Sequence, residues 1–114
     1  MVRIPRQGDI LLVNTAPRSG HEQTEKRPYI VLSHDVVAKY SNVVIVAPIS
    51  TTSRDSPLYV PINPSYKMKT SGKVLLDRLT TIDYEARPCK FLEKANQNLT
   101  AELLLKVKAV FQRV

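Results

Sequence analysis

Short apolar runs rich in Val and Ile alternate along most of the chain with polar connectors that contain Pro or Gly. Both apolar residue types favour the pleated surface of a β-sheet, and runs of this length are typical of strands. The pattern predicts strands over residues 9–14, 29–33, 42–49, 58–62, 73–77 and 89–94. The run 42–49 is apolar almost throughout, so we expect a central strand covered on both faces.

The spacing of the apolar residues changes in the last part of the chain. There they recur three or four positions apart, as on one face of an amphipathic helix, and they are Leu99, Leu103, Leu104, Val107, Val110, Phe111 and Val114. Thr100 is expected to cap this helix, and Glu102 in the first turn suits the helix dipole. Shorter helical turns are predicted at 35–40 and 83–87.

Consecutive strands followed by one helix indicate a mainly β (α+β) fold rather than an alternating α/β fold. We expect a small antiparallel β-barrel or rolled sheet with a C-terminal amphipathic helix. The chain has 114 residues and shows no linker or internal repeat, so residues 1–114 are expected to form a single domain.

Composition narrows the partners and the compartment. The formal net charge is +7, which favours a polyanionic partner such as nucleic acid, with a simple solubility role as the alternative. Cys89 is the only cysteine, so an internal disulfide is excluded and a reducing cytoplasm is expected. No apolar run approaches the ~18 residues of a membrane span, so we expect no membrane association.

The longest connector between predicted strands carries the sequence GHEQTEKRP at residues 20–28. Long connectors in small domains are often functional. Pro28 biases the preceding Arg27 toward extended backbone, so Arg27 enters the next strand in a constrained direction. His21 and Glu22 begin a zinc-protease motif, but its second histidine is missing and the chain has two His and one Cys, so we expect no metal site and no cofactor.

Two further clusters carry candidate chemistry. The segment STTSRD at 50–55 follows the buried strand, and its hydroxyl and N–H groups suit a phosphate oxygen, although an ordinary turn has the same composition. The segment VLLDRLTTIDYEAR at 74–87 taken alone indicates a strand end with ion pairs.

Together, GDILLVNTAPRSGHEQTEKRPYIVLS, VVIVAPIST and VLLDRLTTIDYEAR resemble, in order and spacing, the MazF/PemK (Kid) family of bacterial toxin endoribonucleases. The resemblance runs from Gly8 through Arg87. It implies a small SH3-like barrel, a homodimer, and metal-independent cleavage of single-stranded RNA (mRNA) at short sequences. The reaction it implies is attack by the RNA 2′-OH, giving a 2′,3′-cyclic phosphate and a 5′-OH. It also implies a cognate antitoxin protein that covers the RNA groove.

The resemblance assigns residues by position. Arg27 matches the catalytic Arg of an Arg-Pro motif, and Ser50 stands where the family has a catalytic Thr, with Thr51 beside it. His21 and Asp77 match the catalytic His and Asp of the PemK branch. Which of Ser50 and Thr51 is the functional hydroxyl stays open at this point.

The remaining assignments concern the charged connector and the basic residues. Glu22 and Gln23 match a Glu-Gln pair of the family, and Glu22, Asp77 and His21 are alternative proton donors or acceptors. Where the PemK branch has an Arg two residues before its Asp, this chain has Leu75, and Arg78 and Thr80 also depart from the family pattern. Contacts to RNA are expected from Gln23, Lys26, Arg54, Arg78 and Arg87, with a solvated charge as the alternative for Lys26.

The chemistry agrees with these assignments. RNA carries its own nucleophile, so the protein has to accept a proton, stabilise charge on phosphorus and protonate the leaving oxygen. Arg27 offers a planar and permanently charged donor for the phosphate oxygens. The competing hypotheses are a non-catalytic toxin that binds DNA gyrase and a catalytically weak RNA-binding relative.

Overall fold

The computed structural model describes residues 3–14 and 26–113. Its strands are β1 (Asp9–Asn14), β2 (Lys26–Val31), β3 (Val44–Ser50), β4 (Tyr59–Pro61), β5 (Lys73–Leu75), β6 (Thr80–Ile82) and β7 (Cys89–Lys94). Its helices are α1 (Asp35–Ser41), α2 (Gln97–Lys106) and α3 (Lys108–Phe111), with 3₁₀ turns η1 (Pro64–Tyr66) and η2 (Leu76–Arg78). No helix among the described residues is long and apolar enough to cross a membrane.

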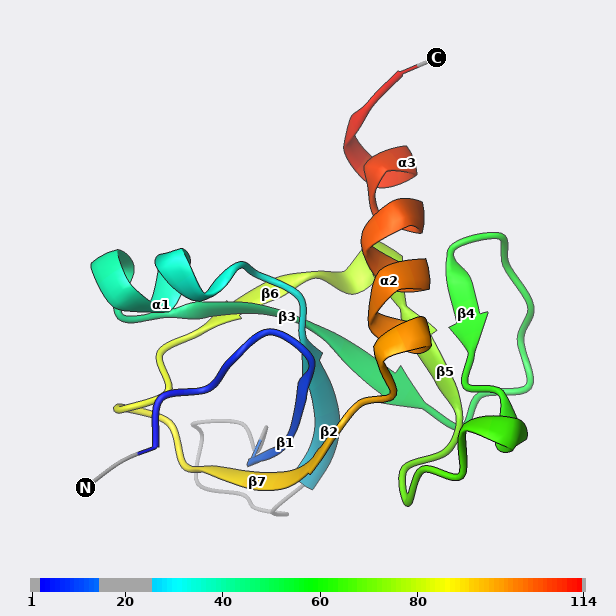
Figure 1. The fold of residues 1–114 in the computed structure, drawn as a ribbon. Coiled ribbons are helices and arrows are strands. Elements are labelled where there is room, and N and C mark those ends of the chain that lie inside the picture. Colours follow the sequence, from blue (N-terminus) through cyan, green and yellow to red (C-terminus); the bar gives the residue numbers. More distant parts are fainter. Residues whose placement is uncertain (1–2, 15–25, 114) are drawn as a thin grey trace, which may run out of the picture.

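The strands form one antiparallel sheet in the order β4-β5-β3-β2-β1-β7, and β6 pairs with the first half of β3 (Figure 1). No ladder joins β4 to β7 in the described part of the chain, so the sheet is rolled but open. Of the two expected forms, a small barrel or a rolled sheet, the structure has the rolled sheet, and the mainly β fold with a C-terminal helix is confirmed. The strands β4, β5 and β6 have three residues each, and η2 separates β5 from β6, so this half of the sheet is too short to close on β7.

Both faces of the sheet are buried. On one face Ile30 and Ile49 pack in a cluster with Leu99 and Leu103 of α2, the helix that crosses the sheet (Figure 1). On the other face alternate residues of the same strands pack with Ala38 of α1 and with Tyr84; they are Leu11, Val13, Val31, Val44 and Val46. The prediction that 42–49 is a central strand covered on both faces is thus confirmed, because β3 contributes to both clusters.

The C-terminal helix differs from the prediction in its start and in its buried face. The Asn96 side chain accepts a hydrogen bond from the Asn98 N–H at 2.8 Å, so Asn96 is the cap and Thr100 lies inside the helix. The helix is interrupted at Val107, and α3 follows. Leu99 and Leu103 are fully buried, and Val107 and Val110 pack partly buried against the same cluster, but Phe111 is 74% exposed.

Smaller elements were only partly predictable. Residues 83–87 form a single turn, closed by a 2.9 Å hydrogen bond from the Arg87 N–H to the Asp83 carbonyl. The strand β6 was not predicted, because three residues are too few to show a period.

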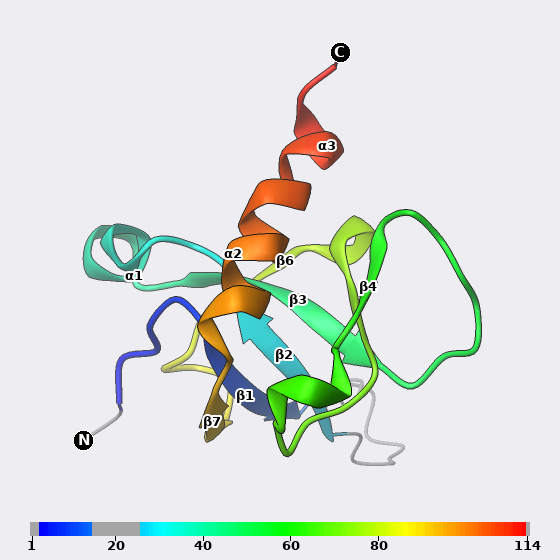
Figure 2. The ribbon, with the colours of Figure 1, turned by 45° about the vertical axis from the view of Figure 1, so that its right-hand side comes forward.

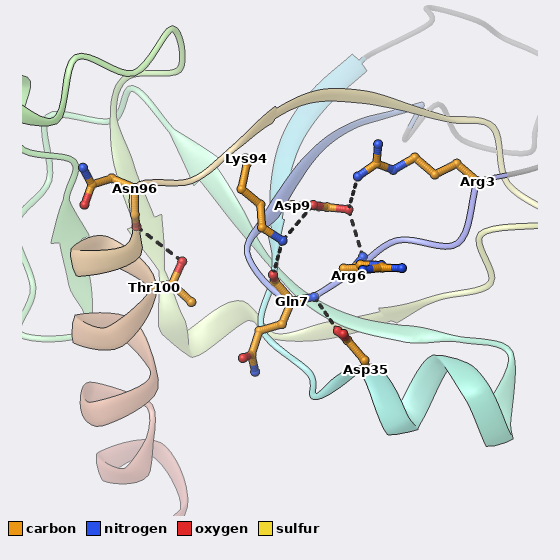
Figure 3. Close-up of polar contacts among 8 residues, drawn as sticks. All are labelled: Arg3, Arg6, Gln7, Asp9, Asp35, Lys94, Asn96 and Thr100. Carbon is orange, nitrogen blue, oxygen red and sulfur yellow. Dashed lines mark hydrogen bonds and ion pairs between the residues drawn. The ribbon is translucent and has the colours of Figure 1, made fainter.

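The Gly-Asp pair at the start of the first strand has a structural role, which the contacts of Asp9 show. Its carboxylate is fully buried, yet it accepts hydrogen bonds from Lys94 Nζ at 3.2 Å, from the Arg6 N–H at 2.9 Å and from Arg3 Nη2 at 3.3 Å (Figure 3). The positive partners compensate the charge that burial would otherwise penalise. Asp9 therefore fastens the N-terminal segment and β1 to the end of β7.

Gly8 turns the chain into this arrangement. Its φ is +90°, and a Cβ at this position would lie 3.3 Å from Thr100 Oγ1 of α2. Next to it, the Gln7 N–H donates to Asp35 Oδ1 at the start of α1, and the Gln7 carbonyl accepts from Lys94 Nζ (Figure 3). The Gly-Asp pair is thus a structural junction between β1, β7, α1 and α2.

Candidate functional site

Strand register brings together two predicted site residues, Arg27 and Ser50, and a third polar residue, Lys73. The β2–β3 ladder pairs Tyr29 with Pro48, so continuing it by two residues places Arg27 opposite Ser50. The β3–β5 ladder pairs Ser50 with Lys73. Because side chains alternate between faces, all three lie on the face that holds the Val31 and Val46 cluster.

We call Arg27, Ser50 and Lys73 the cross-strand row. The start of β2 and the end of β3 lie toward the same side of the sheet in both ribbon views (Figure 2). Opposed side chains on neighbouring antiparallel strands are generally about 5 Å apart at Cβ. A cation, a hydroxyl and a second cation thus follow one another across three strands.

The hydroxyl of Ser50 has a defined orientation. Its Oγ accepts a hydrogen bond from the Thr52 N–H at 3.1 Å, so its own proton is left to donate to a ligand. Ser50 is half-buried at the strand end, whereas Thr51 is exposed. In the same way Thr52 Oγ1 accepts from the Arg54 N–H at 3.2 Å. The segment after β3 is therefore a pair of Ser/Thr turns. This geometry agrees with an ordinary turn and also leaves the Ser50 hydroxyl able to donate to a phosphate oxygen.

Gly72 fixes the backbone at Ser50. Its φ is +122°, and a Cβ there would lie 2.4 Å from the Ser50 carbonyl oxygen. No real Cβ tolerates such a separation, so only glycine lets the start of β5 pass this close to the end of β3. The position of Ser50 is thus set by neighbouring backbone rather than by its own side chain.

Lys73 holds the loop that follows Ser50. Its Nζ donates to the Arg54 carbonyl at 2.7 Å and to Asp55 Oδ1 at 2.8 Å. The hydrogen bond from Lys73, and then its charge, hold the pKa of Asp55 below the usual value. The Lys73 side chain is 19% exposed and that of Asp55 95% exposed. Sequence reasoning missed Lys73, because its relation to Ser50 comes only from the ladder register.

Arg87 lies at the same end of the sheet as the row. Its Nη1 donates to the carbonyl of Asn14, the last residue of β1, at 3.3 Å, and Asn14 pairs with Lys26. A hollow of about 510 Å³ opens beside it, lined in part by Thr81 and Asp83. Lys26 immediately precedes Arg27 and therefore faces the opposite side of the sheet, away from the row.

Cys89 lies on the face of the row, opposite Val13 of β1. Its half-buried thiol donates to the Arg87 carbonyl at 3.2 Å. Burial raises the pKa of the Cys89 thiol against the opposing pull of the Arg87 charge. The thiol therefore stays protonated near neutral pH and is a poor nucleophile.

The other predicted residues are placed differently. Asp77 and Arg78 lie exposed in η2, which directly follows β5 and contacts β3, and within the described part of the chain neither has an ion-pair partner. The ion pairs expected at this strand end are thus not formed there. His21, Glu22 and Gln23 lie outside the described residues. No group of three or more His, Cys, Asp or Glu among the described residues is arranged to hold a metal ion.

An open antiparallel sheet crossed by one helix, with a cation–hydroxyl–cation row at one end, defines a small basic domain suited to a phosphate-bearing ligand. Residues 6–111 match the family described as PemK-like, MazF-like toxin of type II toxin-antitoxin system. The chain therefore belongs to this toxin family, and the resemblance seen in the three sequence clusters is confirmed.

Individual relatives agree with the family match. An endoribonuclease MazF of Staphylococcus saprophyticus is 36% identical over 81 residues, which cover 68% of each protein. The crystal structure of MazF from Deinococcus radiodurans (Form-I) matches with a TM-score of 0.77 and 26% identity, over 95% of this chain and 96% of that one. A MazE-MazF structure from the same organism (Form-II) has a TM-score of 0.82 at 26% identity, with the same coverage.

Proposed function

We propose that this protein is the toxin of a type II toxin–antitoxin pair and an endoribonuclease that cleaves single-stranded RNA. The observation that supports the proposal is the register of β2 against β3, which when continued brings Arg27 and Ser50 opposite each other in the cross-strand row. The name of the Staphylococcus relative, an endoribonuclease, supports the reaction class.

Arg27 and Ser50 are the groups that we assign to the scissile phosphate. The guanidinium presents a fixed fork of donors to two non-bridging oxygens. The Ser50 hydroxyl adds one donor, because its oxygen is already occupied by the Thr52 N–H. Donors aimed at charge that develops on the phosphorane lower the barrier more than they strengthen substrate binding.

The reaction needs no nucleophile from the protein. The RNA 2′-oxygen bonds to the adjacent phosphorus while the bond from phosphorus to the 5′-oxygen breaks. The 2′-proton passes to a base, and an acid protonates the leaving 5′-oxygen. We assign these two roles to Glu22, His21 and Asp77 as a group, and of these Asp77 is the one in the described part of the chain. Arg54, Arg78 and Arg87 supply cations for flanking phosphates.

The partners follow from charge and family. With a net charge of +7, the chain suits an acidic antitoxin segment that lies over the row and excludes RNA. Deinococcus MazF has been solved with MazE, which supports such a complex. A reducing cytoplasm, where Cys89 stays free, is the compartment that we propose.

A homodimer is also part of the proposal. Leu99 and Leu103 are buried within the chain, whereas Leu105 and Phe111 of the C-terminal helices are exposed and offer apolar surface. Ile4, Val36 and Tyr40 are exposed around a hollow of about 1090 Å³ and offer apolar surface for a second copy. Light scattering is expected to give twice the chain mass of 12.9 kDa at micromolar concentration, and a monomer mass would contradict this part of the proposal.

The nucleophile provides the test of the function. We expect RNA with a single 2′-deoxy nucleotide just 5′ of the cut to bind normally and resist cleavage, because the phosphates that dominate affinity are unchanged. Unmodified RNA should give a 2′,3′-cyclic phosphate and a 5′-OH, also in the presence of EDTA. Normal cleavage of the deoxy substrate, or 5′-phosphate products, would overturn the mechanism.

A further inference from the structure

We infer that Lys73 is a positioning residue for RNA binding, which holds the loop 51–55 so that Arg54 is presented beside the cross-strand row. The inference rests on the proposed function. It concerns a residue that no sequence motif singled out and that touches the site through its loop.

The ladder makes Lys73 a fixed anchor. Lys73 and Ser50 are paired in the β3–β5 ladder, and Lys73 is also paired with Pro61 of β4, so strands flank it on both sides. Gly72, directly before it, packs against the Ser50 carbonyl. The Lys73 backbone is therefore as well fixed as the end of β3 itself.

The loop, in contrast, depends on the Lys73 side chain. Beyond Ser50 the described contacts of residues 51–55 are the two Ser/Thr turns and the two bonds from Lys73 Nζ. The turns set the local backbone, but only Lys73 ties the loop to another strand. The bond is made to the backbone carbonyl of Arg54, the residue whose guanidinium is expected to contact RNA.

The two hydrogen bonds of Lys73, to Asp55 and to the Arg54 carbonyl, contribute unequally to holding the loop. The pair with Asp55 is almost fully exposed on the Asp55 side, and such surface pairs contribute little. The bond to the Arg54 carbonyl is charge-assisted and comes from a side chain that is mostly buried. Holding the loop is therefore the work of the lysine–carbonyl bond, with Asp55 as an auxiliary acceptor.

This division predicts which kinetic constant responds. Ser50 is held by the ladder, by Gly72 and by its own turn, so the donor to the scissile phosphate stays in place without Lys73. Without the Lys73 ammonium the Arg54 backbone is not fixed before RNA binds, so the same Arg54 contact has to be ordered on binding. Loss of the Lys73 ammonium should therefore weaken RNA binding and leave the chemical step almost unchanged.

The experiment compares Lys73→Met, Lys73→Arg, Asp55→Asn and Lys106→Met on one single-stranded RNA. Lys106 is the matched control, because it also donates to a carboxylate at 2.9 Å but lies on α2, away from the row. We expect Lys73→Met to raise KM roughly three- to tenfold with kcat within about twofold. Lys73→Arg should restore most of the loss, and Asp55→Asn and Lys106→Met should stay within about twofold of wild type.

Salt dependence separates positioning from direct phosphate contact. If Lys73 bound a phosphate itself, Lys73→Met would lower the slope of log affinity against log salt by about 0.7 on a single strand. The positioning role leaves this slope at its wild-type value, and faster amide hydrogen exchange over residues 52–55 should accompany Lys73→Met.

The outcomes are distinguishable. A wild type that cleaves RNA, with Lys73→Met equal to Lys106→Met in KM, would overturn the positioning role and leave the proposed function intact. A reduced salt slope would also overturn positioning, in favour of direct contact. A folded wild type that cleaves no single-stranded RNA would overturn the proposed function itself.

Discussion

The two hydroxyls at the end of β3 differ in their surroundings although they are adjacent in the chain. Ser50 is half-buried and its oxygen is occupied by a backbone N–H, whereas Thr51 is exposed and follows the strand. Only Ser50 belongs to the cross-strand row, because side chains alternate along a strand. We therefore propose Ser50 as the functional hydroxyl, a choice that the sequence left open.

Substitution of each hydroxyl tests this choice. We expect Ser50→Ala to lower kcat roughly a hundredfold, the loss typical of one donor to a developing anion, with KM little changed. Ser50→Thr should retain activity, since it keeps the hydroxyl, and Thr51→Ala is the matched control and should stay within about threefold. A large loss with Thr51→Ala and none with Ser50→Ala would shift the functional hydroxyl by one residue.

For single residues, the sequence motifs identified candidate site residues but not the residues that contact them in the fold. Arg27 could be chosen from the Arg-Pro motif and the hydroxyl cluster from its composition, because these are local patterns, but the choice between Ser50 and Thr51 stayed open. Lys73 could not be chosen in this way, since only strand pairing brings it to Ser50 from a distant part of the chain. Asp9 was seen only as part of a motif, and its burial against Lys94 depends on the fold.

Among the elements, the connector between η1 and β5 is tied to β7 by one carboxylate. Glu93 of β7 accepts from the Lys69 N–H at 3.0 Å and from the Thr70 N–H and hydroxyl, each at 2.7 Å. Burial raises the pKa of Glu93, but the Thr70 and Lys69 hydrogen bonds and the Lys69 charge together lower it further than burial raises it. The net pKa lies below the usual value, so the contact favours the ionised form.

The sign of this shift gives a pH dependence. A carboxylate with a lowered folded-state pKa stabilises the fold above its unfolded pKa of about 4.3, and the contribution is lost as the pH falls through the folded value. We expect Glu93→Gln to lower the free energy of unfolding at neutral pH by about 1 kcal/mol, a figure reduced for solvent exposure.

Urea unfolding at several pH values measures this contribution. The difference between wild type and Glu93→Gln should be constant from neutral pH down to about 5 and should shrink at lower pH. Glu85→Gln is a suitable control, because Glu85 is exposed and has no ion pair in the described chain. A difference that grows on acidification would contradict the assignment.

Element prediction succeeded where a strand shows its own pattern. The strands β1 and β7 have the bounds that were predicted for them, and β3 lies within two residues of its predicted bounds, because each has six or seven residues with a pattern of its own. The three-residue β6 was missed, and the choice between a barrel and a rolled sheet was left open. Both features depend on how short strands are shared along β3, and no pattern within those segments encodes that.

In the whole molecule, the buried Asp9 connects the N-terminal segment with β7, which lies near the C-terminal end of the chain. It joins the N-terminal segment, β1 and β7, and the neighbouring Gln7 contacts Asp35 of α1 (Figure 3). Gly8 lies close to α2, where a Cβ would meet Thr100. The cations around Asp9 are about half exposed, with side-chain exposures of 56% for Arg3 and 55% for Lys94. The acid is thus the member of the cluster that depends most on its partners.

Because Asp9 is buried and Lys94 is half exposed, we expect substitutions of the two residues to lower the free energy of unfolding by different amounts. Lys94→Met leaves a buried carboxylate short of a partner and should lower the free energy of unfolding by about 3 kcal/mol. Asp9→Asn removes the charge, keeps an acceptor for the Arg6 N–H, and lets Lys94 turn to water, so it should cost clearly less. Urea denaturation of both variants provides the measurement, and a larger loss for Asp9→Asn would contradict this account.

The same ion pair has a consequence for how the protein is made. Asp9 and Lys94 are separated by 85 positions, which a ribosome translates in roughly 4 to 17 s at bacterial and eukaryotic speeds of about 5–20 residues per second. Throughout that interval the nascent β1 has neither its partner strand β7 nor the ammonium that neutralises its acid. The first strand can pair with β2 early, but its pairing with β7 and the neutralisation of Asp9 come only when β7 has been made. We therefore expect a chain truncated before β7 to be unstable and inactive.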